Sequence, residues 1–192
     1  MGSPVTIRDA REEDAPALAA IYRHYVEKTA VTFDETAPDD EAFAEKIRET
    51  KKTHPFLAAE DGDGRILGYA YAHPFVGRAA YRWSAETTIY LAPDAKRRGI
   101  GRALYGELEE RLRAMGILTL YACIGVPRQE RDEDGILTFD SVRFHEKMGY
   151  RTVGTFSCCA YKFSRWLDMA WMEKRLAPLP FPDPPREIEK PG

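Results

Sequence analysis

The sequence has few cysteines, and they are poorly placed for cross-linking. Its 192 residues include only Cys123, Cys158 and Cys159, and adjacent cysteines rarely bridge each other without strain. The scarcity argues against a disulfide framework and favours a reducing, cytoplasmic setting. No metal-ligand spacing links these cysteines to histidine, so no metal site is predicted. Packing in the core is the more common role for such residues than nucleophilic catalysis.

Long apolar runs and an excess of one charge are also lacking. No segment approaches the roughly 20 apolar residues that a membrane-spanning helix needs, so no membrane partner is predicted. The 28 basic and 31 acidic residues leave a net charge of -3, which argues against a general nucleic-acid binder. Any basic binding site must therefore be local.

The chain carries enough apolar residues for one substantial core. Its hydrophobic content is 44% over 192 residues, and nothing in the composition marks a second domain. We expect a single domain over residues 1–177. The proline-rich segment 178–192 is expected to be a disordered or surface-bound tail.

Hydrophobic periodicity predicts strands and helices in a mixed order. An Asp61–Gly64 turn joins two of the strands, and the polar segment 127–135 is expected to be a mobile surface loop. The order predicts an α/β sandwich with a mixed sheet covered by helices on both faces. The expected strands are 5–8, 56–60, 66–72, 85–91, 119–124, 150–157 and 166–173. The expected helices are 14–25 (capped by Asp14), 38–53, 100–115 and 141–148.

The most informative segment is Lys96–Ala103, which joins a strand pattern to an amphipathic helix pattern. Gly99 and Gly101 allow a tight turn that exposes backbone N–H groups, and the positive end of the helix dipole favours an anion. The flanking basic side chains would add charge-assisted contacts to a diphosphate. A basic turn that merely caps a helix is the alternative interpretation.

This segment resembles the glycine turn of the GNAT acetyltransferases, Gln/Arg-x-x-Gly-x-Gly/Ala, which holds the diphosphate of acetyl-CoA. The resemblance runs from about Val5 to Leu176 and is closest to the phosphinothricin or methionine sulfoximine branch. Residues 80–90 resemble its Tyr-x-Trp-Thr-x-Glu-x-Thr-Val-Tyr stretch, residues 142–150 its motif ending in His-Glu-x-x-Gly-Tyr, and residues 161–168 its Lys-x-Gly-x-Trp-x-Asp segment. Lys96 stands where the family usually has Gln or Arg.

The resemblance implies a GNAT fold, with a sheet that splays beside the central strand to admit the pantetheine arm. It implies acetyl-CoA as co-substrate and a homodimer. Backbone groups of Ile89, Tyr90 and Leu91 would pair with pantetheine. The phosphates would be held by Arg97, Arg98, Gly99, Ile100, Gly101 and Arg102.

Glu86 is the candidate general base, because acetyl transfer to an ammonium needs a proton acceptor. Its place in an apolar strand favours partial burial and a raised pKa. The alternative is a glutamate that faces solvent or pairs with an arginine. His145 stands where many GNAT enzymes place the acid for the departing thiolate, and imidazole suits acid or base work. Alternatively, His145 packs against Tyr150 or caps Gly149. His24, His54 and His73 have no comparable context.

The candidate acceptor-binding residues combine arginine with aromatic rings, which suits a small amino acid bound through its carboxylate or phosphinate. They are Phe33, Arg78, Tyr81 and Thr87. The resemblance implies a further contribution from Lys162 and Arg165 through the C-terminal strand, across a dimer interface.

The sequence thus predicts an N-acetyltransferase that moves the acetyl group of acetyl-CoA directly to the amine of a small, amino-acid-like acceptor. Direct attack is favoured because no cysteine neighbours the proposed base in the sequence. Two alternatives remain, which are a protein or peptide N-acetyltransferase and a non-catalytic acetyl-CoA sensor.

Overall fold

The computed structural model describes residues 4–128 and 135–179. The predicted strands and helices are present there, with ends that differ by a few residues. The strands are β1 (Val5–Asp9), β2 (Phe56–Asp61), β3 (Ile66–Pro74), β4 (Ser84–Leu91), β5 (Thr119–Val126), β6 (Arg151–Lys162) and β7 (Arg165–Arg175). The helices are α1 (Ala15–Lys28), α2 (Asp40–Lys51), α3 (Ile100–Ala114) and α4 (Asp140–Lys147).

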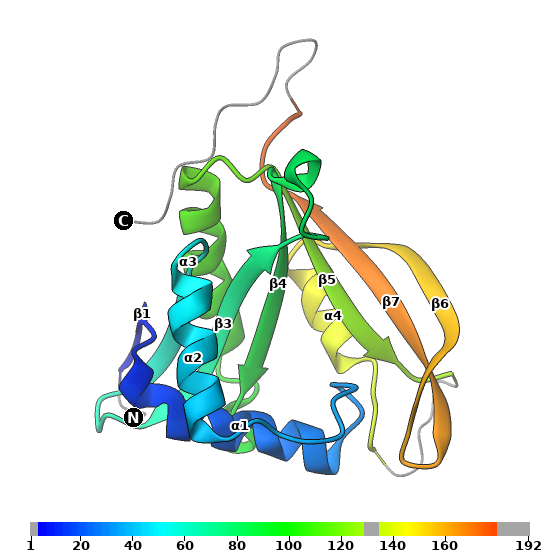
Figure 1. The fold of residues 1–192 in the computed structure, drawn as a ribbon, viewed down its shortest axis with the longest axis horizontal. Coiled ribbons are helices and arrows are strands. Elements are labelled where there is room, and N and C mark those ends of the chain that lie inside the picture. Colours follow the sequence, from blue (N-terminus) through cyan, green and yellow to red (C-terminus); the bar gives the residue numbers. More distant parts are fainter. Residues whose placement is uncertain (1–3, 129–134, 180–192) are drawn as a thin grey trace.

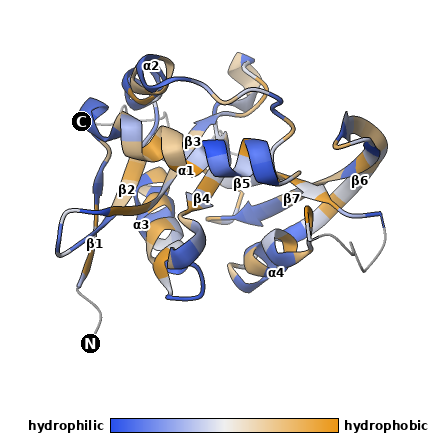
Figure 2. Ribbon diagram, turned by 90° about the horizontal axis from the view of Figure 1, so that it is seen from below, coloured by the Kyte–Doolittle hydropathy of each residue, from blue (hydrophilic) through white to orange (hydrophobic). Residues whose placement is uncertain are grey.

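One sheet with the order β1-β2-β3-β4-β5-β7-β6 forms the centre of the molecule. The β4–β5 pair is parallel and the other neighbours are antiparallel. Helices α1 and α2 cover one face, and α3 and α4 cover the other (Figure 2). The predicted mixed sheet with helices on both faces is confirmed.

The parallel pair β4–β5 separates soon after it forms. Its register covers only Ser84–Glu86 against Thr119–Tyr121, and the two strands diverge from there toward their C-terminal ends (Figure 1). The edge of β4 from Thr87 onward therefore lies beyond the β5 register, where backbone groups need another partner. The Leu91 carbonyl has one, because it accepts from the Tyr25 hydroxyl at 2.6 Å.

The core is built from the apolar stripes that the periodicity predicted. Helix α3 buries Ile100, Leu104, Leu108 and Leu112 against the sheet, and each such side chain contributes about 1.5–3 kcal/mol by leaving water. Because this stripe starts at the first residue of α3, the helix is anchored close to the glycine turn.

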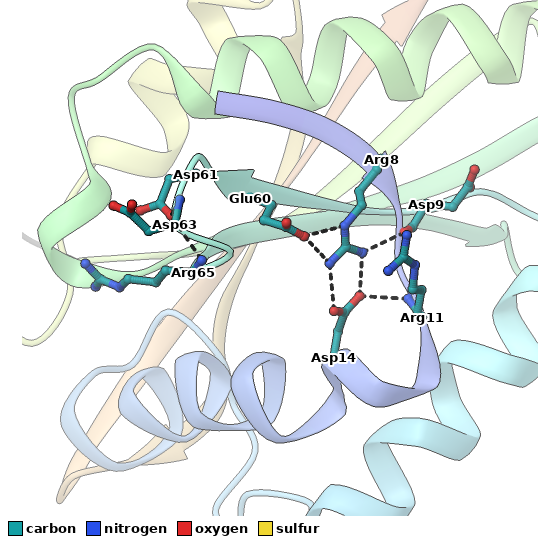
Figure 3. Close-up of polar contacts among 8 residues, drawn as sticks. All are labelled: Arg8, Asp9, Arg11, Asp14, Glu60, Asp61, Asp63 and Arg65. Atoms are coloured by element: carbon teal, nitrogen blue, oxygen red, sulfur yellow. Dashed lines mark hydrogen bonds and ion pairs between the residues drawn. The ribbon is translucent and has the colours of Figure 1, made fainter. Parts of the chain in front are cut away.

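The N-terminal end of α1 differs from the prediction. Asp14 precedes the helix, but its side chain makes no cap hydrogen bond to it. Its carboxylate instead accepts two bonds from the Arg8 guanidinium, at 2.7 and 2.8 Å, and one from the Arg11 N–H at 2.8 Å. Arg8 also pairs with Glu60 and so joins β1, β2 and the start of α1 (Figure 3). In contrast, Asp39, within the segment expected to begin the second helix, caps α2 by accepting a hydrogen bond from the Ala42 N–H.

The three cysteines do not pack in the core as expected. All are free, with Cys123 and Cys159 exposed and Cys158 half-buried. Most of the predicted loop 127–135 and of the tail 178–192 lies outside the described residues.

Candidate active site

The turn between β4 and α3 has the backbone geometry that its glycines predicted. Gly99 precedes α3 with φ +80°, a conformation that glycine adopts without steric cost. The Ala103 N–H donates to the Gly99 carbonyl, so the N–H groups of residues 100–102 precede the first intrahelical bond, as in helix N-termini that bind anions.

Gly101 serves a different purpose, which is close packing. A Cβ added there would lie 3.1 Å from Cε2 of Phe144 and 3.6 Å from Cδ1 of Ile89. A side chain at this position would therefore press on the Phe144 ring of α4, whereas its distance to Ile89 of β4 is an ordinary van der Waals contact. The two glycines therefore form the turn together, one through its φ angle and the other through its size.

A cavity of about 510 Å³ lies beside this turn. It is lined by the predicted cofactor residues Ile89, Tyr90, Leu91, Arg97 and Gly101, together with Tyr25, Val31, Lys96, Thr138, Asp140, Ser141, Arg143, Phe144 and Lys147. The other predicted turn residues lie differently. Arg98, Gly99 and Arg102 are exposed, whereas Ile100 is buried in the core.

The cavity is predominantly basic. Among the described residues that line it, Lys96, Arg97, Arg143 and Lys147 are basic and Asp140 is the one carboxylate. The contribution of α4 was not predicted, although Arg143 and Lys147 are spaced i, i+4 and so share one helix face. Such a lining favours an anionic ligand.

Glu86 lies at the last register position that β4 shares with β5, opposite Tyr121. Its side chain is 21% exposed. Burial raises the pKa of the Glu86 carboxyl, and the nearby His73 partly opposes this. The carboxylate is therefore suited to accept a proton at the point where the two strands part.

His73, which the sequence analysis did not single out, is the cross-strand partner of Glu86. The β3–β4 register places the two residues opposite each other, and His73 Nε2 lies 3.8 Å from Glu86 Oε2. The signal was the antiparallel pairing of the two strands, which composition does not reveal.

His145 is buried on the other side of the sheet, at 3% exposure. Its Nδ1 lies 2.7 Å from the Ser141 carbonyl and its Nε2 2.9 Å from the Tyr105 hydroxyl, so Nδ1 carries the proton and Nε2 accepts. Burial lowers the pKa of the imidazole to about 4. The ring lies edge-on to Tyr150 at 5.1 Å, as the alternative interpretation predicted, and this geometry does not support a role as acid at neutral pH.

Thr87 does not lie with Glu86, contrary to its expected acceptor role. Adjacent strand residues point to opposite faces, and Thr87 is buried with its hydroxyl 3.0 Å from Tyr150 OH and 3.2 Å from the Tyr121 carbonyl. Thr87 therefore belongs to the buried polar cluster around Tyr105 and His145.

Aromatic rings gather on the Glu86 face of the sheet. Phe75 stacks on Tyr121 at 4.1 Å, with Tyr81 and Trp171 edge-on to it at 5.6 and 5.7 Å. Of these rings, only Tyr81 was predicted to contact an acceptor.

The other predicted acceptor residues lie at separate places. Arg78 and Tyr81 line a second cavity of about 360 Å³ that also includes Pro74 and Ser84, next to the His73–Glu86 pair. The described lining of this cavity does not include Glu86. Phe33 packs over Gly125 of β5. A Cβ added at Gly125 would lie 3.1 Å from the Phe33 ring.

Lys162 has a structural use that the sequence did not indicate. Its ammonium donates to the carbonyls of Thr29 and Thr32, at 3.1 and 2.9 Å. It therefore ties the β6–β7 hairpin to the segment between α1 and α2 instead of facing an acceptor.

A cysteine does lie near the proposed base in the folded chain, although none neighbours it in the sequence. This residue is Cys123. It lies two residues beyond Tyr121 on β5, on the same face as Glu86. Although Cys123 is accessible, the surrounding protein and the charge of Glu86 raise the pKa of its thiol to about 12. The thiol is therefore protonated at neutral pH and a poor nucleophile.

Comparison with known proteins places the chain in a family. The acetyltransferase (GNAT) domain model matches residues 7–171. The chain belongs to the GNAT acetyltransferase family. A phosphinothricin N-acetyltransferase of Streptomyces coelicolor is 37% identical over 90% of the chain and 96% of its own length, and an L-methionine sulfoximine/L-methionine sulfone acetyltransferase of Pseudomonas aeruginosa is 34% identical over 90% and 95%. A GNAT phosphinothricin acetyltransferase of Sinorhizobium meliloti, solved in complex with AcCoA, superposes with a TM-score of 0.83 at 33% identity, covering 95% of this chain and 94% of that one.

The GNAT family and the GNAT fold predicted from the sequence are thus confirmed. In the described part of this GNAT chain, no helix is both long and apolar enough to cross a membrane. The same residues contain no group of three or more His, Cys, Asp or Glu side chains that could hold a metal ion.

Proposed function

We propose that this GNAT protein transfers the acetyl group of acetyl-CoA to the amine of a small amino-acid-like acceptor, of the phosphinothricin or methionine sulfoximine type. The names of its relatives support the acceptor class. The observation that carries the proposal is a half-buried carboxylate, Glu86, placed where β4 and β5 diverge.

The residues around the larger cavity fit acetyl-CoA. The N–H groups after Gly99, which precede the first intrahelical bond, and the basic side chains of Arg97, Arg143 and Lys147 suit its phosphates. The β4 edge from Thr87 onward has backbone groups beyond the β5 register that can pair with the amides of pantetheine, apart from the Leu91 carbonyl, which accepts from the Tyr25 hydroxyl. Acetyl-CoA supplies the activated acetyl thioester.

Glu86 is the group we assign to the proton of the acceptor. An amine attacks only as the free base, so an ammonium acceptor must lose a proton at the site. Partial burial disfavours the Glu86 carboxylate, and this makes it a stronger proton acceptor than a solvated glutamate. The Phe75, Tyr81, Tyr121 and Trp171 rings on the same face would enclose the carbon chain of the acceptor, and Arg78, which lines the neighbouring cavity, would pair with its acidic group.

Direct transfer to the acceptor is favoured over an acetyl-enzyme. Cys123 is the cysteine that shares the Glu86 face, and its thiol pKa of about 12 keeps it protonated. His145, buried and bonded at both ring nitrogens, is assigned a positioning role through Tyr105 and Ser141.

The decisive variant is Glu86→Gln, which keeps the shape of the side chain and removes its basicity. CoA release should be followed with a thiol reagent against a panel of amino acids, their phosphinate and sulfoximine analogues, polyamines and peptides. We expect kcat/KM for the best acceptor to fall about 100-fold or more, while the Kd for acetyl-CoA measured by calorimetry stays within error. Turnover of the variant at the original rate would disprove the assignment.

The same panel separates the alternatives. A preference for peptides over free amino acids would favour a protein or peptide N-acetyltransferase. Acetyl-CoA binding without release of CoA for any amine would favour a sensor.

We further propose a homodimer in a reducing cytoplasm. The exposed apolar side chains of the β6–β7 hairpin support a second copy as partner; they are Val153, Phe156, Tyr161, Phe163 and Trp166. The three free cysteines are in keeping with the reducing setting.

A further inference from the structure

The β3–β4 pairing puts an imidazole against the proposed base. His73 and Glu86 are directly opposite residues of antiparallel strands, and such residues have neighbouring side chains on one face of the sheet. His73 Nε2 lies 3.8 Å from Glu86 Oε2. This distance is within ion-pair range but too long for a hydrogen bond, so the imidazole acts on the carboxylate mainly through its charge.

The orientation of the His73 ring is set by its other nitrogen. Nδ1 lies 3.2 Å from the Pro74 carbonyl, which can only accept, so Nδ1 carries a proton. Nε2 therefore faces Glu86, and when it also binds a proton the ring is a cation beside the carboxylate. The His73 side chain is 39% exposed and can exchange that proton with solvent.

Other titratable groups on this side of the sheet are buried or contact other side chains. His54, on the loop before β2, is buried, and burial together with the charge of His73 lowers its pKa to about 4. Lys46 of α2 is held over the ring of Tyr71, with 4.7 Å between its Nζ and the ring centroid.

The titratable groups next to β4 and on β5 also have other contacts or stay uncharged. Arg82 lies over the Trp83 ring, with 4.3 Å from its Cζ to the centroid. On β5, the thiol of Cys123 stays protonated at neutral pH. His73 is thus the group of the described chain that has ion-pair geometry to Glu86.

We propose that His73 is a positioning residue that keeps Glu86 in the ionised form able to accept the proton of the acceptor amine. The inference rests on the proposed role of Glu86 in acetyl transfer. Burial favours the protonated form of Glu86, which cannot act as a base, and a protonated His73 opposes this effect. The His73 charge acts across 3.8 Å in a half-buried setting, where screening by solvent is incomplete.

A direct test is the titration of the Glu86 carboxyl in the full-length protein, without turnover. Protein labelled with ¹³C at glutamate Cδ is titrated by NMR, and Glu86→Gln assigns the resonance. Replacement of His73 by Gln removes the cation and should raise the apparent pKa of Glu86 by roughly half a pH unit. His73→Lys, which restores a cation, should return it toward the wild-type value. His24→Gln, which removes an imidazole packed edge-on against Tyr25, should leave it unchanged.

The pH profile of kcat/KM then tests the link to catalysis, with L-methionine sulfoximine as the acceptor probe. We expect the acidic limb to move upward in His73→Gln by the same amount as the Glu86 titration, and to move back in His73→Lys. An unchanged Glu86 titration would overturn the inference, and so would a shifted titration with an unmoved acidic limb. The proposed function has its own test, because full turnover by Glu86→Gln would disprove the role of Glu86 whatever the His73 variants show.

Discussion

Burial decides what the two histidines near the site can do. His73 is partly exposed and can carry a charge beside Glu86, whereas His145 is closed off and bonded at both nitrogens. The two side chains are chemically identical, but of the two only His73 keeps access to solvent. Sequence context favoured His145 because of its family motif, whereas the strand register revealed His73.

The buried His145 makes stability depend on pH. Its pKa is about 4 in the folded protein, against 6.5 as the ordinary value. Between these two values the unfolded chain binds a proton that the folded chain does not, so stability falls as pH decreases from 6.5 and the loss levels off below about 4. His54 contributes in the same window, so a variant is needed to separate the two.

The contribution of His145 can be separated from that of His54 by urea unfolding of the wild type and of His145→Gln at two pH values. We expect the stability advantage of the wild type over the variant to shrink by about 2 kcal/mol between about pH 7.5 and about pH 5, from the linkage of one such site. An advantage that stays constant would mean that His145 titrates normally in the folded protein.

At the scale of elements, the turn between β4 and α3 contains two residues with positive φ, Arg97 at +61° and Gly99 at +80°. Gly99 has φ +80° with open space around it, so a side chain there is strained but does not clash. Gly106 lies within the same helix and also has open space, but without a positive φ.

Alanine at these two positions should therefore have opposite effects. Gly99→Ala should lower the free energy of unfolding by about 1–2 kcal/mol, and we expect it to raise KM for acetyl-CoA because it distorts the anion-binding turn. Gly106→Ala should raise the free energy of unfolding by roughly 0.5–1 kcal/mol and leave KM unchanged. Denaturant titration and steady-state kinetics check both. Equal effects from the two variants would show that the conformation of the turn is unimportant.

The elements themselves were predictable because their signals are local. Periodicity and turn residues marked the strands, the helices and the glycine turn. The exceptions depended on distant residues. Asp14 does not cap α1 because its carboxylate accepts from Arg8 and from the Arg11 N–H. Lys162 does not face an acceptor because its ammonium donates to the carbonyls of Thr29 and Thr32, about 130 residues away in sequence. Cys123 reached the Glu86 face only through the parallel pairing of β4 with β5.

At the scale of the whole molecule, the two edges of the sheet differ. Strand β1 at one edge is short and carries Val5 as its exposed large apolar residue, whereas β6 at the other edge is longer and carries Val153, Phe156 and Tyr161, each more than half exposed. A long, apolar edge favours association, because unpaired backbone groups and apolar surface occur together there.

This asymmetry predicts a dimer formed through β6. The 21.8 kDa chain should elute at twice its mass in size-exclusion chromatography with light scattering. Phe156→Lys should shift the population toward monomer because it places a charge within the apolar contact. Val5→Lys introduces the same charge at the opposite edge and should leave the dimer intact. A wild-type monomer at high concentration, or dissociation by both variants alike, would contradict the assignment of the β6–β7 hairpin as the interface.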